Sequence, residues 1–533
     1  MKAAYLRSIA NISLYFWTTF FYNLTFKDCN ENLVCIFGQN LSFVGALKKL
    51  AGETAIYGMS SIVGRFINWW LVPYYSRIFL PEEYGVVTNL YSYVAFLLVI
   101  LTFGMETGFF RYANKTEKYD KIYSTSAFAL FGSSALFVLI AFVFSGNFAG
   151  FLDFPNSEQY IKWLAVIVAL DAGTAIPFAN LRLEGKAVRF ATLKMVNIFF
   201  NIFFNVFFLT VCPYILKAHP DSFIRIIYHA EFGVGYVFVS NLIASLITLI
   251  MLIPEIRKIK LTFDWGLFRE MFWYSFPILL VGIFGMVNQN IDKILIPELI
   301  PASQKPMEQL GIYGANYKLA ILMNMFIQAF RYSFEPFFFS HQKSSDSRLI
   351  YAQVMKYFVI FGLLIFLGIT LFIDVFKIII GSEYHSGLKV VPAVLMANLF
   401  MGIYFNLSLW YKLSDKTWMG AWIAGVGAVL TILANVLLIP TMGYMGSAYG
   451  VLVCFIIMTI ISYIVGQKYY RVEYELKRIL MYIGLSIGLY YLSDYIHFSG
   501  SILKYGFNIG LFSAFLGVVY FAEKNDIQSL LKR

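Results

Sequence analysis

The sequence predicts an all-α membrane protein with about fourteen transmembrane helices, and three observations support this prediction. The chain of 533 residues is 59% hydrophobic and only 13% charged, whereas soluble domains carry about a quarter charged residues. Its apolar residues occur in runs of about twenty, the length that crosses about 30 Å of hydrocarbon as a helix. Its lysines and arginines are concentrated in the short segments between these runs.

The apolar runs form two blocks of six and a final pair. The first block has spans near residues 55–78, 85–110, 122–144, 161–180, 190–212 and 234–253. The second has spans near 270–294, 312–334, 350–373, 388–411, 418–439 and 443–466, and the pair lies near 477–495 and 505–521. We therefore predict a first six-helix lobe (51–255), a second six-helix lobe (265–468) and a C-terminal helix pair (476–523).

Residues 1–50 form an N-terminal extension of unclear role. The segment 9–26 is apolar and aromatic, but a polar stretch follows before the first span of the core begins. No small-residue cleavage site of the signal-peptide type follows it. An interfacial helix, an extra span and a start codon assigned too far upstream all stay open as interpretations.

The distribution of positive charge predicts the orientation, because lysine and arginine in short loops are retained in the cytoplasm. Loops after even-numbered spans are rich in them, as in the loop with Arg111, Lys115, Lys118 and Lys121. Loops after odd-numbered spans carry far fewer. We therefore expect both ends of the helical core to be cytoplasmic, and the formal net charge of +11 reflects topology instead of a nucleic-acid partner.

The sequence contains no pattern for a metal, a cofactor or a nucleotide. The four cysteines have neither C-x-x-C nor Cys/His spacing, so neither a zinc site nor a disulfide framework is expected. No Walker sequence and no Gly-rich phosphate loop is present. We therefore expect no cofactor.

Two short matches indicate an internal duplication. Residues 85–91 (GVVTNLY) align with 311–317 (GIYGANY), and 180–183 (NLRL) aligns with 406–409 (NLSL) at the same offset. Each match joins equivalent spans of the two blocks. The lobes are therefore predicted to be parallel repeats, an arrangement in which transporters place the substrate path between the halves.

Polar side chains inside the spans are the candidates for function, because an ionised group at mid-bilayer costs about 2.5 to 3.5 kcal/mol. Several of them repeat at helical spacing and therefore share one face of a span. The predicted substrate-binding residues are Arg65, Asn68, Asn197, Asn201, Asn205, Gln328 and Arg331. Amides can both donate to and accept from sugar hydroxyls, and guanidinium groups bind phosphate bidentately. This lining favours an anionic, polyhydroxylated cargo.

Other readings of the same residues stay open. Asparagines on membrane helices often join neighbouring helices. Asp171 and Glu106 are candidates for coupling transport to an ion, whereas Asp292 and Lys293 are expected to cap a helix end. The G-x-x-x-G spacings Gly484/Gly488 and Gly506/Gly510 predict close packing of the last two helices.

The stretch 51–115, which begins AGETAIYGMSSIVGRFINWW, resembles the opening of Wzx-type polysaccharide-biosynthesis flippases of the multidrug/oligosaccharidyl-lipid/polysaccharide (MOP) superfamily. The resemblance continues to about residue 525 and implies two six-helix lobes around a cationic cavity. It implies transport of undecaprenyl-pyrophosphate-linked oligosaccharide across the cell inner membrane for O-antigen, capsule or exopolysaccharide assembly. Arg65 resembles a first-helix arginine of related peptidoglycan-precursor flippases. Implied partners are the lipid-linked oligosaccharide, membrane lipids, a polysaccharide polymerase and chain-length machinery.

Two alternative functions remain. A cation-coupled multidrug exporter of the same fold would be expected to centre on buried carboxylates, for which Asp171 and Glu106 are the candidates. A membrane-embedded polysaccharide polymerase or ligase usually carries a large periplasmic loop, and the longest loop of this core spans only about 215–233. An enzyme is therefore not expected.

Overall fold

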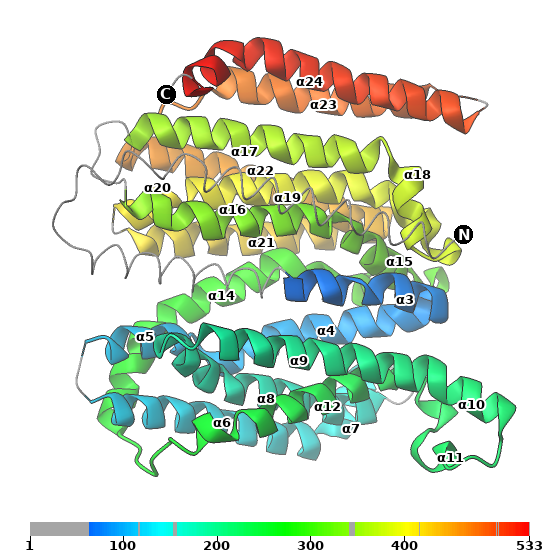
Figure 1. Cartoon of the computed structure of the whole chain (residues 1–533), viewed down its shortest axis with the longest axis vertical. Helices are drawn as coiled ribbons and strands as arrows, with labels where there is room; N and C mark the ends of the chain where they lie inside the picture. The colour runs from blue at the N-terminus through cyan, green and yellow to red at the C-terminus, as the bar shows by residue number, and fades with distance from the viewer. Residues whose placement is uncertain are drawn as a thin grey trace. The chain divides into compact units, whose positions relative to one another are not determined.

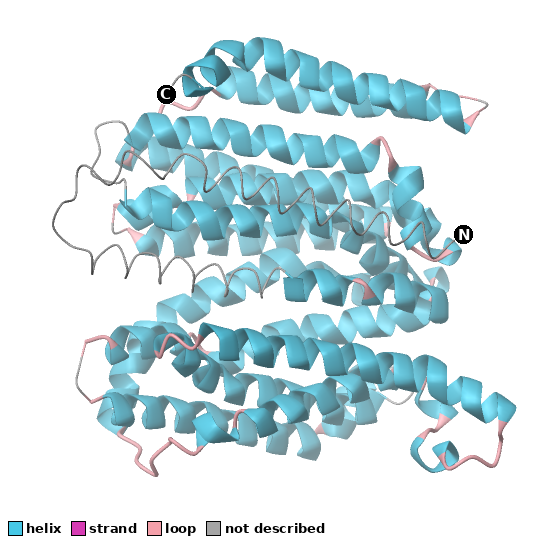
Figure 2. Cartoon of the chain, in the orientation of Figure 1, coloured by secondary structure: helices cyan, strands magenta, loops and turns pink. Residues whose placement is uncertain are grey.

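A computed structural model describes residues 63–531 except 116–117, 153–156, 341–346, 415, 497 and 499. The chain divides into two compact units, Met1–Tyr57 and Gly58–Arg533, and every described residue belongs to the second. The predicted extension over 1–50 therefore lies outside the described residues. The part of the chain that is described consists of helices and loops without strands (Figure 2), so the all-α prediction is confirmed.

The first lobe begins with a helical segment at 63–69, which leads into α3. Its helices are α3 (Leu71–Ile78), α4 (Pro81–Thr102), α5 (Met105–Ala113), α6 (Tyr119–Val143), α7 (Ser145–Leu152), α8 (Ser157–Leu183), α9 (Ala187–Val206), α10 (Cys212–Ala218), α11 (Ile224–Ile227), α12 (Gly235–Met251) and α13 (Ile253–Ile256). The second predicted span is broken between α4 and α5, where Phe103 and Gly104 both have positive φ. This left-handed backbone cannot continue a right-handed helix.

The second lobe and the C-terminal pair follow. Their helices are α14 (Trp265–Leu299), α15 (Pro306–Tyr317), α16 (Ile321–Ser340), α17 (Ser347–Thr370), α18 (Ile373–Phe376), α19 (Val391–Leu407), α20 (Leu409–Leu413), α21 (Thr417–Met442), α22 (Tyr444–Tyr469), α23 (Leu476–Tyr495) and α24 (Ser501–Leu531). The eighth predicted span is also divided, because a 3₁₀ turn at Lys318–Ala320 separates α15 from α16. Each lobe therefore contains an interrupted span.

Within the described ranges, ten helical stretches are long and apolar enough to cross a membrane. The predicted spans outside this set are the first, sixth, eighth and thirteenth. The first is only partly described, and α12, the sixth, has 17 residues. The prediction of a multi-pass helical membrane protein is confirmed, whereas the number fourteen stays a prediction.

The helices of each lobe run side by side, and α14 crosses obliquely between the lobes (Figure 1). The beginning of α14 lies against the first lobe, where a Cβ at Gly108 would meet Ser275 Oγ. Farther along, Asn288 Nδ2 donates to the carbonyl of Ala424 in α21 at 3.3 Å. The helix α14 therefore contacts helices of both lobes.

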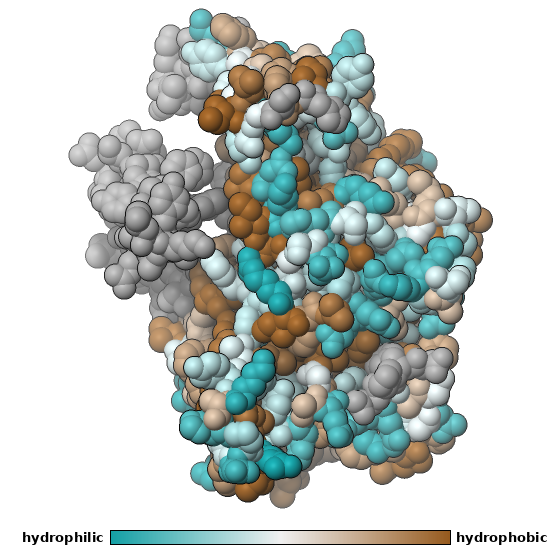
Figure 3. All heavy atoms as spheres, turned by 90° about the vertical axis from the view of Figure 1, so that its right-hand side faces the viewer, coloured by the Kyte–Doolittle hydropathy of each residue, from teal (hydrophilic) through white to brown (hydrophobic). Residues whose placement is uncertain are grey.

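The outer surfaces of the helices are apolar, as contact with lipid requires. On α6, Leu136, Leu139 and Val143 are 58%, 61% and 66% exposed. Figure 3 looks onto the end of the helices that Figure 1 shows at the right, and hydrophilic side chains are spread over that end. Apolar flanks with polar ends match a segment that spans a bilayer.

The C-terminal pair is held to the second lobe at both ends, by α17 at one end and by α18 at the other. At one end the ammonium of Lys356 lies 2.6 Å from both Glu475 and Glu523, and Lys356 and Glu523 are fully buried. At the other end Asp374 lies 2.5 Å from Lys504. Hydrogen bonds from Lys377 and Lys504 lower the pKa of Asp374, which keeps its carboxylate charged.

The prediction that the G-x-x-x-G glycines pack the last two helices together is wrong. A Cβ added at Gly484, Gly488, Gly506 or Gly510 would meet none of the described neighbours within 4 Å. The pair is joined by larger side chains, such as Ser493, which donates to Asn508 Oδ1 at 2.7 Å.

Candidate substrate cavity

A cavity of about 400 Å³ lies between the first lobe and the second. Its walls come from α3 and the helix that leads into it, from α14, α16 and α19, and from the 3₁₀ turn before α16. It is lined by Arg65, Asn68, Trp69, Val72, Gln289, Lys318, Ile321, Asn324, Met325, Ile327, Gln328, Arg331, Met401 and Phe405. Four of the seven predicted binding residues, Arg65, Asn68, Gln328 and Arg331, are therefore brought together here.

Three cations line this cavity, and its lining includes no aspartate or glutamate. Arg65 comes from the first lobe, whereas Lys318 and Arg331 come from the second. The guanidinium of Arg331 lies over the ring of Phe405, with 4.4 Å between Cζ and the ring centroid, a cation–π contact that helps to orient it. The lining therefore carries positive charge without a lining counter-ion.

Four amide side chains, from Asn68, Gln289, Asn324 and Gln328, complete the polar part of the lining. The rest is apolar and includes Met325, Met401 and Phe405. Trp69 joins the two walls, because its Nε1 donates to the carbonyl of Lys318 at 2.9 Å. The cavity can thus offer charge, paired donors and acceptors, and an apolar surface to one ligand.

Lys318 was missed in the sequence analysis, and Gln289 and Asn324 were not among the predicted binding residues. Lys318 occupies the short 3₁₀ turn between α15 and α16, inside a predicted span. A single lysine within an apolar run is the signal that could have identified it, because such a residue normally faces a cavity or a partner.

The asparagines of α9 do not line the cavity. Asn205 is fully buried, accepts from the hydroxyl of Tyr75 at 2.7 Å and donates to Asn201 Oδ1 at 2.8 Å. Asn197 Nδ2 donates to Thr248 Oγ1 of α12 at 2.9 Å. These amides join α9 to its neighbours within the first lobe, as the helix-packing interpretation expects. A substrate-binding role for Asn197, Asn201 and Asn205 stays a prediction.

The two predicted coupling residues also lie within the first lobe and outside the cavity. Asp171 of α8 accepts a hydrogen bond from Ser245 of α12 at 2.9 Å. Glu106 of α5 pairs with Arg182 at the end of α8. Each carboxylate therefore has a partner on a neighbouring helix, and the coupling role stays a prediction.

Asp292 and Lys293 do not cap a helix end, because α14 continues to Leu299. Asp292 is 1% exposed, accepts from the hydroxyl of Tyr313 at 2.6 Å and pairs with Lys293 at 3.0 Å. Ser447 of α22 donates to the same carboxylate at 3.3 Å. The pair thus forms a buried polar cluster that joins α14, α15 and α22.

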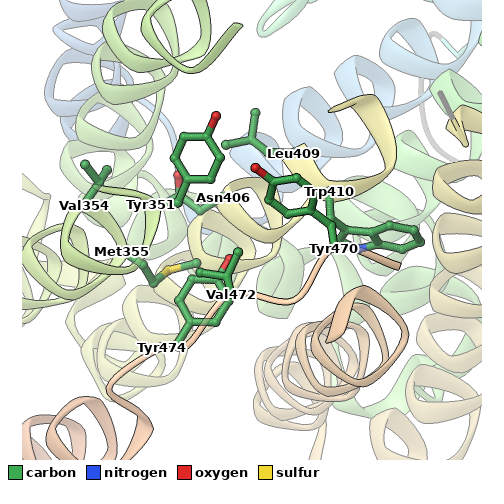
Figure 4. Close-up of a pocket in the computed structure, with 9 residues that line it drawn as sticks. All are labelled: Tyr351, Val354, Met355, Asn406, Leu409, Trp410, Tyr470, Val472 and Tyr474. Atoms are coloured by element: carbon green, nitrogen blue, oxygen red, sulfur yellow. The ribbon is translucent and has the colours of Figure 1, made fainter. Parts of the chain in front are cut away.

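A second, much smaller cavity lies under Tyr351, Asn406 and Tyr470 (Figure 4). Its volume of about 20 Å³ admits roughly one water molecule. Asn406 Nδ2 is buried there without a hydrogen-bond partner among the described residues, so a water would satisfy it. This cavity is too small for a lipid-linked sugar.

Two helical lobes with a charged cavity between them are the arrangement typical of membrane transporters. Solved structures of other proteins share this fold. "Lipid II flippase MurJ, inward closed conformation" has a TM-score of 0.66 and 14% identity, and the match covers 87% of this chain and 99% of that one. An "inward-facing conformation of a multidrug resistance MATE family transporter of the MOP superfamily" has a TM-score of 0.59 and 12% identity, over 78% and 94% of the two chains. At these identities the likeness shows the fold.

The family is shown by the sequence itself. Residues 75–389 match the family described as "Polysaccharide biosynthesis protein", and the chain belongs to this family. No curated protein matches the chain. The expected resemblance to flippases of the MOP superfamily is therefore confirmed at the level of family and fold.

Proposed function

We propose that the protein is a flippase that moves undecaprenyl-pyrophosphate-linked oligosaccharide from the cytoplasmic to the periplasmic leaflet of the cell inner membrane. The observation that carries the proposal is the cavity lined by Arg65, Lys318 and Arg331 without a lining carboxylate. A diphosphate supplies the missing negative charge, and the four lining amides suit sugar hydroxyls. Both ends of the core are proposed to be cytoplasmic, with a polymerase and chain-length machinery acting on the delivered unit.

Two alternative functions are less well supported. The "MATE multidrug transporter DinF-BH" shares the fold, with a TM-score of 0.55 and 13% identity over 79% of this chain and 96% of that one. Three lining cations would repel a positively charged drug, which disfavours a cation exporter. A polymerase or ligase would have to perform bond chemistry, whereas the fold matches membrane transporters.

Reconstitution tests the proposed cargo. Purified protein in proteoliposomes is expected to move a fluorescent prenyl-diphosphate-linked oligosaccharide between leaflets at least about tenfold faster than protein-free vesicles do. The rate for a neutral prenyl-linked oligosaccharide of the same length should rise little above that in protein-free vesicles, because this lipid lacks the charge that the three cations bind. Vesicles that move a cationic dye and not the diphosphate lipid would support the exporter instead, and elongated glycan products would support a polymerase.

We also propose that Asp171 couples transport to an ion gradient, with Glu106 as the second candidate. A carboxylate inside a membrane helix is costly, so a site that exchanges protons or cations is a common reason for its presence. Asp171→Asn should abolish the stimulation of transport by an imposed gradient, while transport without a gradient continues. The measurement compares both rates in proteoliposomes with Glu106→Gln alongside. Wild-type transport that is unchanged after collapse of the proton and sodium gradients contradicts the proposal.

A further inference from the structure

The segment between α9 and α12 projects beyond the neighbouring helices of the first lobe as a hairpin (Figure 1). It contains α10 (Cys212–Ala218) and α11 (Ile224–Ile227), and we call residues 212–234 the α10–α11 hairpin. A π-helical stretch at Phe207–Val211 joins α9 to α10, so a continuous helix runs from Ala187 to Ala218. The hairpin is therefore a direct extension of a membrane span.

The depth of the hairpin in a bilayer follows from the length of α9. Near the start of this helix, Arg189 lies 2.9 Å from Glu255, and this ion pair marks one edge of the hydrocarbon layer. A helix crosses about 30 Å of hydrocarbon in about 20 residues, so the other edge lies near Leu209. The helix α10 begins about 5 Å beyond that edge, at the depth of the lipid headgroups.

Stacked aromatic rings fold the hairpin back to this edge. The ring of Tyr228, directly after α11, stacks on Tyr236 with 4.9 Å between centroids, and Tyr236 stacks on Phe208 with 4.8 Å. The hydroxyl of Tyr236 also accepts a hydrogen bond from the backbone N–H of His229 at 2.6 Å. On α11 itself, Ile224 packs against the same cluster of rings. Because Phe208 lies at the edge of the hydrocarbon layer, α11 is held at the boundary between headgroups and acyl chains.

Four large side chains that contact little else make the outer side of the hairpin apolar. Tyr214, Phe223 and Ile226 are 73%, 72% and 68% exposed, and Ile227 is 43% exposed. We call these four side chains the apolar face of the hairpin. The surface of α9 that leads to it is also exposed and apolar, as at Phe203. The lipid-facing surface of the span therefore continues into the hairpin.

Charged side chains accompany the apolar face. Lys217 and Arg225 are exposed beside it and form an ion pair with none of the residues that the structure describes. Lysine and arginine next to large apolar side chains are typical of segments that lie in a membrane interface. Asp221 and Glu231 are exposed as well, so the formal charges of the hairpin cancel. Burial of apolar surface, and not attraction to anionic lipid, is therefore the main contribution to binding.

We propose that the α10–α11 hairpin is a lipid-binding anchor whose apolar face inserts between the headgroups and the first acyl carbons of one leaflet. Lipid is the occupant because the apolar face lies at the depth where lipid surrounds the span that carries it. In the orientation proposed above, this is the periplasmic leaflet. The anchor holds the outer end of α9 at a fixed depth, whichever cargo the cavity binds.

Fluorescence quenching tests this depth without measuring transport. Ile226→Cys carries a bimane label. Cys29 and Cys35 are replaced by serine, and the buried Cys212 and Cys454 stay in place. The protein is reconstituted in vesicles of phosphatidylethanolamine and phosphatidylglycerol that contain a lipid with a nitroxide either near the carbonyls or deep in the acyl chain. Iodide on both sides of the vesicles measures exposure to water.

The shallow nitroxide is expected to quench the label at Ile226 at least about twofold more than the deep one does. Iodide should quench this label at least about threefold less than a label at Ser303→Cys, the matched control for water in the exposed turn before α15. Phe199→Cys is the matched control for hydrocarbon. It is exposed about 15 Å from Arg189 along α9, and the deep nitroxide should quench it more.

A second variant tests the apolar face itself. Phe223→Gln/Ile227→Gln should weaken shallow quenching of the label at Ile226 about twofold, because two of its apolar side chains are removed. If iodide quenches the label at Ile226 as strongly as the label at Ser303, the hairpin lies in water and the anchor is overturned. A label that is exposed in purified vesicles but shielded in membranes of the expressing cells overturns it too, because a protein then covers the apolar face. Phe223→Cys repeats the measurement if Ile226→Cys does not insert.

Discussion

Alanine at Arg65 or Arg331 is expected to reduce transport of a diphosphate-linked oligosaccharide about 10- to 100-fold. Each guanidinium supplies charge-assisted hydrogen bonds worth about 1.5 to 3 kcal/mol, which this loss reflects. Arg65 and Arg331 come from different lobes and line one cavity. The transport rate of the double variant should therefore be no higher than that of the slower single variant. The measurement is the leaflet-exchange rate in proteoliposomes that contain equal amounts of protein.

Two further variants make this prediction specific. Arg65→Lys keeps the charge but loses the bidentate geometry, so its rate should lie between those of wild type and Arg65→Ala. Arg257→Ala removes an exposed arginine outside the cavity and should leave the rate within about twofold of wild type. Normal transport by Arg65→Ala, or an equal loss in Arg257→Ala, would exclude the cavity as the anion site.

Asp292→Asn is expected to lower the free energy of unfolding by about 3 to 5 kcal/mol, because the Lys293 ammonium would stay buried without its carboxylate. The Asp292→Asn/Lys293→Met variant removes both charges and should regain most of the loss. Denaturant or thermal unfolding in detergent measures the difference. If the single variant is as stable as wild type, or the double variant is less stable than the single one, the charge pair is not the source of stability.

The spans could be predicted from sequence because bilayer thickness fixes the length of an apolar run. Their interruptions could not be predicted in this way. The break at Phe103 and Gly104 and the 3₁₀ turn at Lys318 leave hydropathy almost unchanged, since they depend on backbone dihedrals and on packing between helices. Lys318 lies in that turn and lines the cavity.

Helical spacing correctly placed Arg65 with Asn68 and Gln328 with Arg331, because residues three or four apart share a helix face. Spacing does not reveal what that face contacts. The asparagine stripe of α9 is as regular as the others, yet Asn205 bonds to Tyr75 inside the first lobe. Similarly, the sequence suggested that Asp292 and Lys293 end a helix. Hydrogen-bond partners of Asp292, Tyr313 and Ser447, lie on other helices, and the sequence does not show which helices are neighbours.

The two-ended attachment of α23 and α24 to α17 and α18 has a practical consequence. Because the helix pair is attached near Lys356 and again near Asp374, it cannot rotate about either attachment. It therefore keeps a fixed orientation relative to the second lobe. A fluorophore on the exposed side of α24, for example at Ile509, would therefore report the position of the second lobe. Energy transfer between a dye on α6 and this fluorophore would report any change in the distance between the two lobes in real time.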